Sequence, residues 1–143
     1  MKPTYEKEWN QEKDCPSGCS CATNVVDCGS RESSPLFSLP SRIPKIATHL
    51  DMNENSVTKL DNVCRNYDQL RELKLDKNDL TEIKDEAFED CNDMVILTMR
   101  HNKLTEINKD TVSNFSSLKL TLSVNVSLLA WGKYKFWSWT TMI

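Results

Sequence analysis

One apolar frame that closes on an asparagine recurs along the middle of this 143-residue chain. Its most complete copy reads Leu70-x-x-Leu73-x-Leu75-x-x-Asn78-x-Leu80-x-x-Ile83. The asparagines of successive copies are separated by 23, 24 and 23 residues, and they are Asn55, Asn78, Asn102 and Asn125. A repeat of roughly 20 to 50 residues predicts a solenoid, in which each unit buries its apolar face only against its neighbours.

The spacing inside the frame predicts one short strand per repeat. Alternate residues of a strand point to opposite faces, so the leucines face inward and the residues between them face solvent. The return segments carry apolar pairs three residues apart, a spacing that suits one helical turn on the convex side; they are Cys64 and Tyr67, Phe88 and Cys91, Val112 and Phe115. The predicted class is α/β: a right-handed leucine-rich repeat horseshoe with short parallel strands on its concave face.

The repeated asparagine is expected at the turn that follows each strand. Its amide can bond backbone groups that the turn leaves open, and equivalent residues would stack in a column. Burying an unpaired amide costs a few kcal/mol, so the recurrence of one residue type predicts a fully hydrogen-bonded ladder.

Composition divides the chain into four parts. Residues 1–14 are polar and without a period, which predicts a flexible leader or linker. Residues 15–46 form a cysteine-rich N-terminal cap, and residues 47–130 hold three full repeats and one degenerate repeat. Residues 131–143 are predicted to be an irregular tail. We interpret the tail as a non-native ending rather than as an improvised lid over the open end of the stack.

Four of the six cysteines lie in the cap with spacing C-x3-C-x-C-x6-C. A solenoid end needs a cover for its first apolar face, and a hairpin on Val25–Cys28 held by two disulfides would supply one. Four cysteines allow three possible disulfide pairings, and the spacing does not show which of them forms. A zinc site is the rival interpretation, but the uneven spacing fits paired zinc knuckles poorly. We therefore predict no metal site.

The cysteine count favours an oxidising compartment, although the first residues contain no apolar stretch typical of a signal peptide. We expect the chain to be part of a longer secreted or membrane-anchored protein. Cys64 and Cys91 are expected to be buried free thiols. A disulfide between them requires Cα atoms within about 7 Å.

With these residues in view, the chain resembles the start of an extracellular leucine-rich repeat domain of the Slit-like type. Small leucine-rich proteoglycans and neuronal leucine-rich receptors share the pattern C-P-x-x-C-x-C, V-D-C and L-x-x-L-P-x-x-I-P. The matching residues here are Cys15-Pro16, Cys19, Cys21, Val26-Asp27-Cys28, Leu36, Leu39-Pro40 and Ile43-Pro44. The resemblance covers roughly residues 15–125 and implies that Cys15 pairs with Cys21 and Cys19 with Cys28.

Three features depart from that family. The segment between Cys28 and Leu39 is about three residues longer than usual. Cys64 and Cys91 replace large apolar residues of the convex side, and the family's cysteine-rich C-terminal cap is absent from this sequence.

Several function classes find no support. A net charge of −3 without a basic run does not favour nucleic acid as a partner. The sequence contains no run of 18 apolar residues, so no transmembrane segment is predicted in this chain. Three glycines do not provide a phosphate-binding loop, and no grouping of His, Asp and Ser suggests a hydrolase. We predict that the chain is not an enzyme and needs no cofactor.

The concave face is instead the predicted site of recognition, with a protein ligand or receptor as partner. The candidate residues are His49, Asp51, Asn53, Glu72, Lys74, Asp76, Thr98 and Arg100. Asp51 with Lys74, and Asp76 with Arg100, are expected to pair between strands. Surface pairs contribute little stability, so a mixed-charge patch is more useful for orienting a ligand.

The resemblance implies an extracellular binding module in cell signalling, guidance or adhesion. A matrix proteoglycan-like core that binds collagen and a truncated, non-functional fragment of a larger receptor remain as alternatives. Asn114-Phe115-Ser116 is a glycosylation sequon, as is Asn125-Val126-Ser127. We favour Asn114, because a buried amide at Asn125 would compete with glycosylation.

Overall fold

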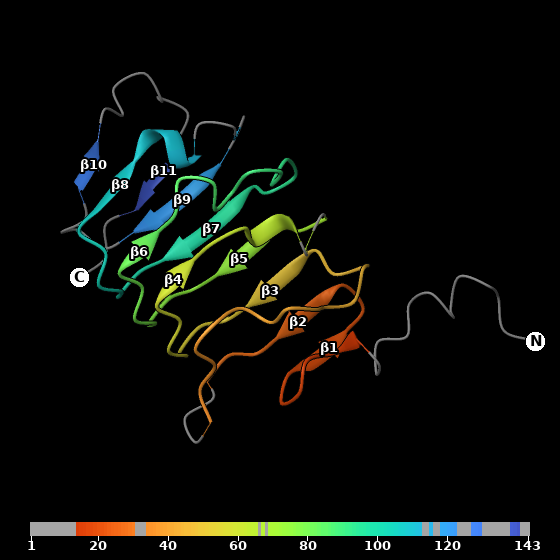
Figure 1. The fold of residues 1–143 in the computed structure, drawn as a ribbon. Helices are drawn as coiled ribbons and strands as arrows, with labels where there is room; N and C mark the ends of the chain where they lie inside the picture. The colour runs from red at the N-terminus through yellow and green to blue at the C-terminus, as the bar shows by residue number, and fades with distance from the viewer. Residues whose placement is uncertain are drawn as a thin grey trace, which may run out of the picture.

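The computed structural model describes residues 14–30, 34–65, 67, 69–112, 115, 118–122, 127–129 and 138–140. Seven strands form one sheet in the order β1-β2-β3-β5-β7-β9-β11 (Figure 1). Their bounds are β1 Ser20–Ala22, β2 Val25–Asp27, β3 His49–Asp51, β5 Glu72–Lys74, β7 Ile96–Met99, β9 Lys119–Leu122 and β11 Ser138–Thr140. Only β1 and β2 are antiparallel within this sheet; the other neighbours are parallel, as predicted.

Four further strands form two small parallel sheets in a second layer of the coil. β4 (Lys59–Leu60) pairs with β6 (Glu82–Ile83), and β8 (Glu106–Asn108) pairs with β10 (Ser127–Leu129). The described parts of the return segments contain two 3-10 turns, η1 (Val63–Arg65) and η2 (Lys109–Val112). The helical turn expected from the i, i+3 apolar pairs is thus a tight 3-10 turn at these two places.

The core lies between the two layers and follows the leucine frame. The central residue of each strand in the frame is buried, and the residues on either side of it are partly exposed. Leu50, Leu73 and Leu97 are aligned in register on successive strands and have at most 1% of their surface exposed. Each buried side chain of this size contributes about 1.5–3 kcal/mol, which explains why stacked repeats are stable together.

The predicted asparagine ladder links each repeat to the one before it. The Asn78 amide donates from Nδ2 to the Met52 carbonyl at 2.9 Å, and its Oδ1 accepts the Val57 N–H at 3.0 Å. Asn102 makes the equivalent bonds to Leu75 and Leu80, at 2.8 and 2.9 Å. The side chain thereby satisfies one donor and one acceptor of the preceding turn.

The ladder also extends into the cap. Asn55 donates to the Cys28 carbonyl at 2.8 Å and accepts the Leu36 N–H at 2.9 Å. The predicted role is therefore confirmed at Asn55, Asn78 and Asn102, whereas Asn125 and the sequon residue Asn114 lie outside the described residues.

The residue before each of these asparagines has a left-handed backbone conformation. Glu54, Lys77 and His101 have φ values of 58°, 57° and 57°. Residues other than glycine pay a conformational cost in this region, so the surrounding structure must hold them there. The asparagine side chain that follows, bonded to the previous repeat, provides that constraint.

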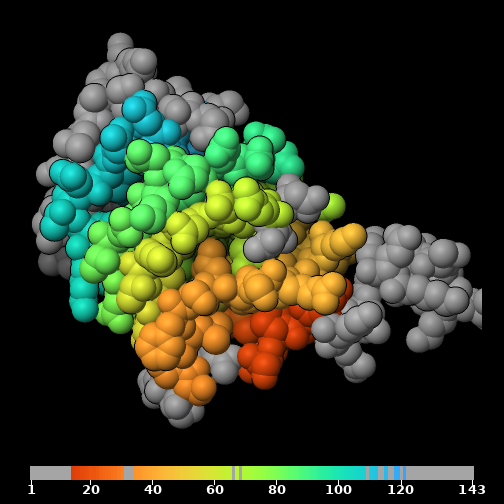
Figure 2. All heavy atoms as spheres, in the orientation of Figure 1, coloured from red at the N-terminus to blue at the C-terminus, as the bar shows by residue number. Residues whose placement is uncertain are grey.

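The cap is a disulfide-linked hairpin. Cys15 bonds Cys21 and Cys19 bonds Cys28, which is the pairing implied by the resemblance. Val26 is buried and pairs in register with Leu50, so the hairpin continues the apolar column of the repeats. Figure 2 shows the cap residues, in red and orange, closing one end of the stack.

The expectation of free thiols at Cys64 and Cys91 is wrong. The two residues form a disulfide with their Cα atoms 5.1 Å apart. Their equivalents one repeat later are Phe88 and Phe115, whose ring centroids lie 5.7 Å apart. The coil places the first apolar residue of one return segment against the second of the next, so positions that are not equivalent in sequence become neighbours in space.

The expectation of a wholly irregular tail is also wrong. Ser138–Thr140 forms β11, which pairs in parallel with β9. Unpaired N–H and C=O groups at the edge of β9 can bond any extended segment, whatever its side chains, so backbone pairing does not require the leucine frame. The degenerate segment Ser127–Leu129 likewise pairs with β8.

The ladder predicts a large effect for Asn78→Ala. The substitution leaves the buried Val57 N–H without its partner and removes one of the two amide donors to the Met52 carbonyl, the other being Asn55. We expect a loss of about 1–3 kcal/mol in the free energy of unfolding. Urea denaturation measures it. Asn92→Ala, at an exposed position, is the control and should change stability by less than about 0.5 kcal/mol. Equal effects of the two substitutions would contradict the ladder.

The disulfide between repeats predicts a second stability effect. Replacing Cys64 and Cys91 together by alanine opens a covalent loop with a sequence separation of 27. The loop-entropy relation gives a loss of about 3–4 kcal/mol, measurable by denaturant unfolding. Peptide mapping of the unreduced wild-type chain should recover one fragment that joins the two cysteines. Separate, alkylatable thiols at both positions would rule the bond out.

Candidate protein-binding surface

The strands of the large sheet present the predicted recognition residues in columns. His49, Glu72 and Ile96 are aligned in register, and so are Asp51, Lys74 and Thr98. These residues alternate with the buried leucines and are partly exposed on the concave face. The alternation predicted from the sequence therefore places six neighbouring side chains on one surface.

Asp76 and Arg100 form the predicted ion pair, and the pair is largely structural. Arg100 donates from Nη2 to Asp76 Oδ2 at 3.0 Å, and its backbone N–H donates to Asp76 Oδ1 at 2.7 Å. Asp76 is only 8% exposed, and its own N–H donates to Asn53 Oδ1 at 2.8 Å. Asn53 and Asp76 thus form a second set of links between repeats.

The expected pair between Asp51 and Lys74 is not among the ion pairs of the described residues. Lys74 Nζ lies 3.9 Å from Glu72 Oε1, two residues away on its own strand. Asp51 Oδ1 instead accepts the Asn53 N–H at 2.9 Å. The register places Asp51 beside Lys74 on the neighbouring strand, but the Lys74 ammonium group pairs with the nearer carboxylate of Glu72.

His49 bridges two neighbours on this face. Its Nε2 lies 3.2 Å from Glu72 Oε2, and its Nδ1 lies 2.7 Å from the Thr48 hydroxyl. Glu72 consequently sits between His49 and Lys74. The local charge of Glu72 is offset by the ammonium group of Lys74 and, when the imidazole is protonated, by His49.

A hollow of about 250 Å³ opens on the concave face where the cap meets the first repeats. We call it the cap-edge hollow; its lining residues are Val25, Asp27, His49, Leu50, Asp51, Glu72 and Lys74. Four of the eight predicted site residues line it. The other four, Asn53, Asp76, Thr98 and Arg100, do not, and the hydroxyl of Thr98 is buried without a hydrogen-bond partner within the described part of the chain.

Two residues of this surface were not predicted from the sequence. Val25 and Asp27 lie on β2 of the cap, in register with His49 and Asp51. The sequence predicts the cap only as a cover for the first repeat. The signal was present in the alternation of Val25, Val26 and Asp27, because a buried Val26 turns both of its neighbours toward the concave face.

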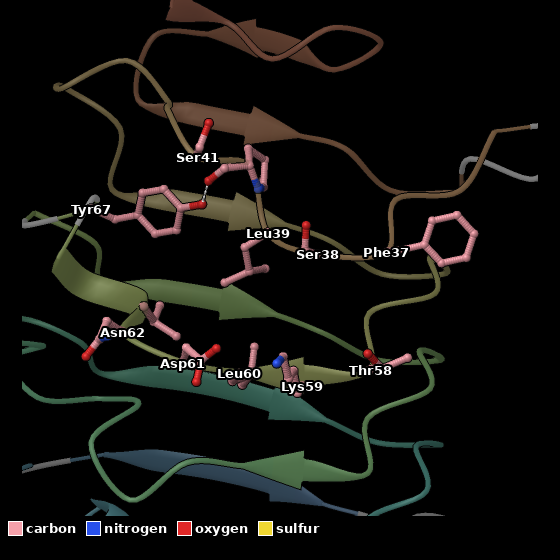
Figure 3. A pocket seen from close by; sticks show the side chains of 12 residues that line it. Phe37, Ser38, Leu39, Ser41, Thr58, Lys59, Leu60, Asp61, Asn62 and Tyr67 are labelled. Atoms are coloured by element: carbon pink, nitrogen blue, oxygen red, sulfur yellow. Dashed lines mark hydrogen bonds between the residues drawn. The ribbon is translucent and has the colours of Figure 1, made fainter.

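A second hollow, of about 290 Å³, lies outside the large sheet (Figure 3). It separates the cap connector, residues 37–41, from β4, and it was not predicted. The Tyr67 hydroxyl donates a hydrogen bond to the Pro40 carbonyl at one end. Phe37 lies at the other end, and 69% of its surface is exposed.

Two kinds of feature are absent from the described residues. They contain no group of three or more His, Cys, Asp or Glu side chains placed to hold a metal ion. In the same part of the chain, none of the helices has the length and apolar character needed to cross a bilayer.

A family model described as Leucine rich repeat matches residues 68–126. The chain is a leucine-rich repeat protein. It is 35% identical over 101 residues to leucine-rich repeat-containing G-protein coupled receptor 5 of Xenopus tropicalis, a match that covers 67% of this chain. Over 115 residues it is 34% identical to leucine-rich repeats and immunoglobulin-like domains protein 2 of Mus musculus, which covers 78% of this chain. The chain spans only 11% of the length of either relative.

Among solved structures, human 5T4 (Wnt-activated inhibitory factor 1, trophoblast glycoprotein) shares the fold. The TM-score is 0.66 at 24% identity, and the match covers 79% of this chain and 42% of that one. With the parallel sheet and the cap disulfides, this likeness confirms the predicted fold class of a capped leucine-rich repeat solenoid.

Tyr67 provides a pH test of the packing between the cap connector and the first repeat. Burial raises the pKa of its phenol well above the ordinary value near 10. The folded state favours the neutral phenol, so this contribution to stability is complete below about pH 10 and is lost as the pH rises further. We expect one of the chain's three tyrosines to ionise only on alkaline unfolding, measured by phenolate absorbance.

In Tyr67→Phe the delayed ionisation should disappear, while the remaining tyrosines keep their titration. A wild-type chain whose tyrosines all ionise together near pH 10, while it is still folded, would contradict the burial of this phenol.

Proposed function

We propose that this chain is an extracellular protein-binding module that recognises a protein ligand or receptor through its concave face. The cap-edge hollow is the observation that carries the proposal. It is lined by four residues chosen from the repeat pattern alone, and the repeats leave these side chains facing outward. A concave array of strands offers an extended surface and no catalytic grouping, which favours binding over chemistry.

The predicted residues contribute in two ways under this proposal. The side-chain oxygens of Asn53 and Asp76 accept hydrogen bonds from the next repeat, so these two residues shape the surface. Direct contacts are assigned to His49, Asp51, Glu72, Lys74 and Thr98, with Val25 and Asp27 added from the cap. Arg100 belongs to both groups, because 32% of its side chain stays exposed although it is paired with Asp76.

The location outside the cell is proposed from cysteine chemistry. All six cysteines of the chain are bonded, and disulfides persist in oxidising compartments. One relative is named as a receptor, which supports signalling as the setting. Because the chain spans a small share of its relatives, we propose that it acts as part of a longer protein.

A stable protein complex buries about 800 Å² on each partner, so the hollow is expected to be one contact within a larger interface. The mixed charges of the concave face suit this role. Complementary charges increase the association rate and exclude wrong partners more than they add affinity.

Reversing one concave charge tests the proposal. The disulfide-bonded chain, made multivalent, is screened against an array of extracellular domains, and each hit is measured again with Lys74→Glu and Lys59→Glu. Lys59 lies on β4, outside the large sheet, and is the matched control. We expect Lys74→Glu to weaken binding at least about tenfold by loss of one complementary contact, while Lys59→Glu changes it little. Hits whose binding is weakened equally by both substitutions would mean that the binding surface lies outside the concave face.

A further inference from the structure

We propose that the cap-edge hollow receives a basic side chain of the protein ligand, preferably arginine, between Asp27 and Asp51. The inference rests on the proposed function and adds to it the chemistry of the contact. The cap thereby contributes one of the two carboxylates as well as closing the stack.

The two carboxylates form an unusual pair. Asp27 on β2 and Asp51 on β3 are direct partners in register, on the same face of the sheet. Like charges directly opposite each other on neighbouring strands are destabilising. A bound cation would offset this repulsion, so the pairing is more readily explained by a ligand than by folding.

Neither carboxylate has a cation of its own. Within the described residues, the ion pairs do not include Asp27 or Asp51. Lys74 and His49, the nearby basic side chains of the hollow, both contact Glu72, at 3.9 and 3.2 Å. The negative charge of Glu72 is therefore offset within the chain, whereas the charges of the two aspartates are available to a partner.

Local backbone bonds fix the position of the two carboxylates. Asp27 Oδ1 accepts the Gly29 N–H, and Asp51 Oδ1 accepts the Asn53 N–H, each at 2.9 Å. A Cβ at Gly29 would lie 3.2 Å from Asp51 Oδ1 and 3.3 Å from Asp27 Oδ1. Glycine at this position allows both carboxylates to approach the same stretch of backbone. Each keeps its second oxygen for another donor.

The apolar part of the hollow suits the stem of a basic side chain. Val25 is 41% exposed and is one of two large apolar side chains exposed within the described residues. Lysine and arginine lay their methylene stems on apolar surface while the charged head stays with polar partners. The guanidinium group has five donors in a planar fork, so it can serve two carboxylates at once, which favours arginine over lysine.

The size of the hollow agrees with this occupant. At about 250 Å³ it falls below the range of about 300–1,000 Å³ typical of small-molecule pockets. One side chain from a protein surface fits it better than a whole metabolite.

A peptide selection tests the inference. A random peptide library displayed on phage is selected against the disulfide-bonded chain, and the strongest binder is synthesised with arginine and with citrulline, its neutral isostere. We expect the citrulline form to bind at least about tenfold more weakly, a loss of roughly 1.4 kcal/mol for one charged contact. The same loss is expected when the arginine peptide meets Asp27→Asn/Asp51→Asn. Asparagine keeps the oxygen that accepts the local N–H, so the turns are preserved.

The control variant is Asp61→Asn/Asp93→Asn, which removes the same charge from two exposed positions outside the large sheet. It should bind the arginine peptide like the wild type. Thermal melting separates a binding role from a structural one. The Asp27→Asn/Asp51→Asn variant should melt at the wild-type temperature or higher, because a repulsive pair has been removed. A lower melting temperature would mean that the carboxylates support the fold, and it would overturn the inference.

Failure of the inference and failure of the proposed function give different results. Peptides that lose binding in Lys74→Glu but tolerate citrulline and Asp27→Asn/Asp51→Asn would overturn only the basic contact. Peptides that bind Lys74→Glu and the double asparagine variant as well as the wild type would count against the concave face as the binding surface.

Discussion

The buried asparagine carboxamide is the interaction on which the rest of this structure depends. A turn that leaves the strand layer carries one N–H with no partner in its own repeat and one C=O that accepts a second donor from the next repeat. Burying such groups unpaired would cost about 1–3 kcal/mol each. The asparagine of the next repeat reaches both groups, as Asn78 does for Met52 and Val57. Each repeat is therefore complete only when its successor is in place and in register.

This constraint also positions the concave surface. Fixed register makes every second residue of β3, β5 and β7 part of a column, so residues about 24 positions apart become neighbours. Asn53 and Asp76 reinforce the same register through backbone N–H groups of the following repeat. Some of the polar residues on the concave face are thus hydrogen-bonded to the next repeat and hold the scaffold together. Asp27 and Asp51 use one carboxylate oxygen each on a local backbone N–H, so the second oxygen of each is the part that we propose for a ligand.

The cap and the inter-repeat disulfide show how the same geometry accepts different chemistry. The cap replaces a leucine-rich unit by a disulfide-linked hairpin, yet Val26 continues the column of Leu50 and Asn55 bonds the cap at Cys28. On the return side, the Cys64–Cys91 bond occupies the place that Phe88 and Phe115 fill one repeat later. Covalent and aromatic contacts are interchangeable there because the coil fixes where the two side chains meet.

The sequence by itself determined the period, the parallel strands, the buried frame and the asparagine ladder. These features follow from contacts between each residue and its equivalent one period away, and a period can be read along the chain. Tertiary structure alone decided the Cys64–Cys91 bond and the pairing of Lys74 with Glu72 instead of Asp51. Each depends on distances between positions that are not equivalent in the repeat, and only the pitch and packing of the folded coil set those distances.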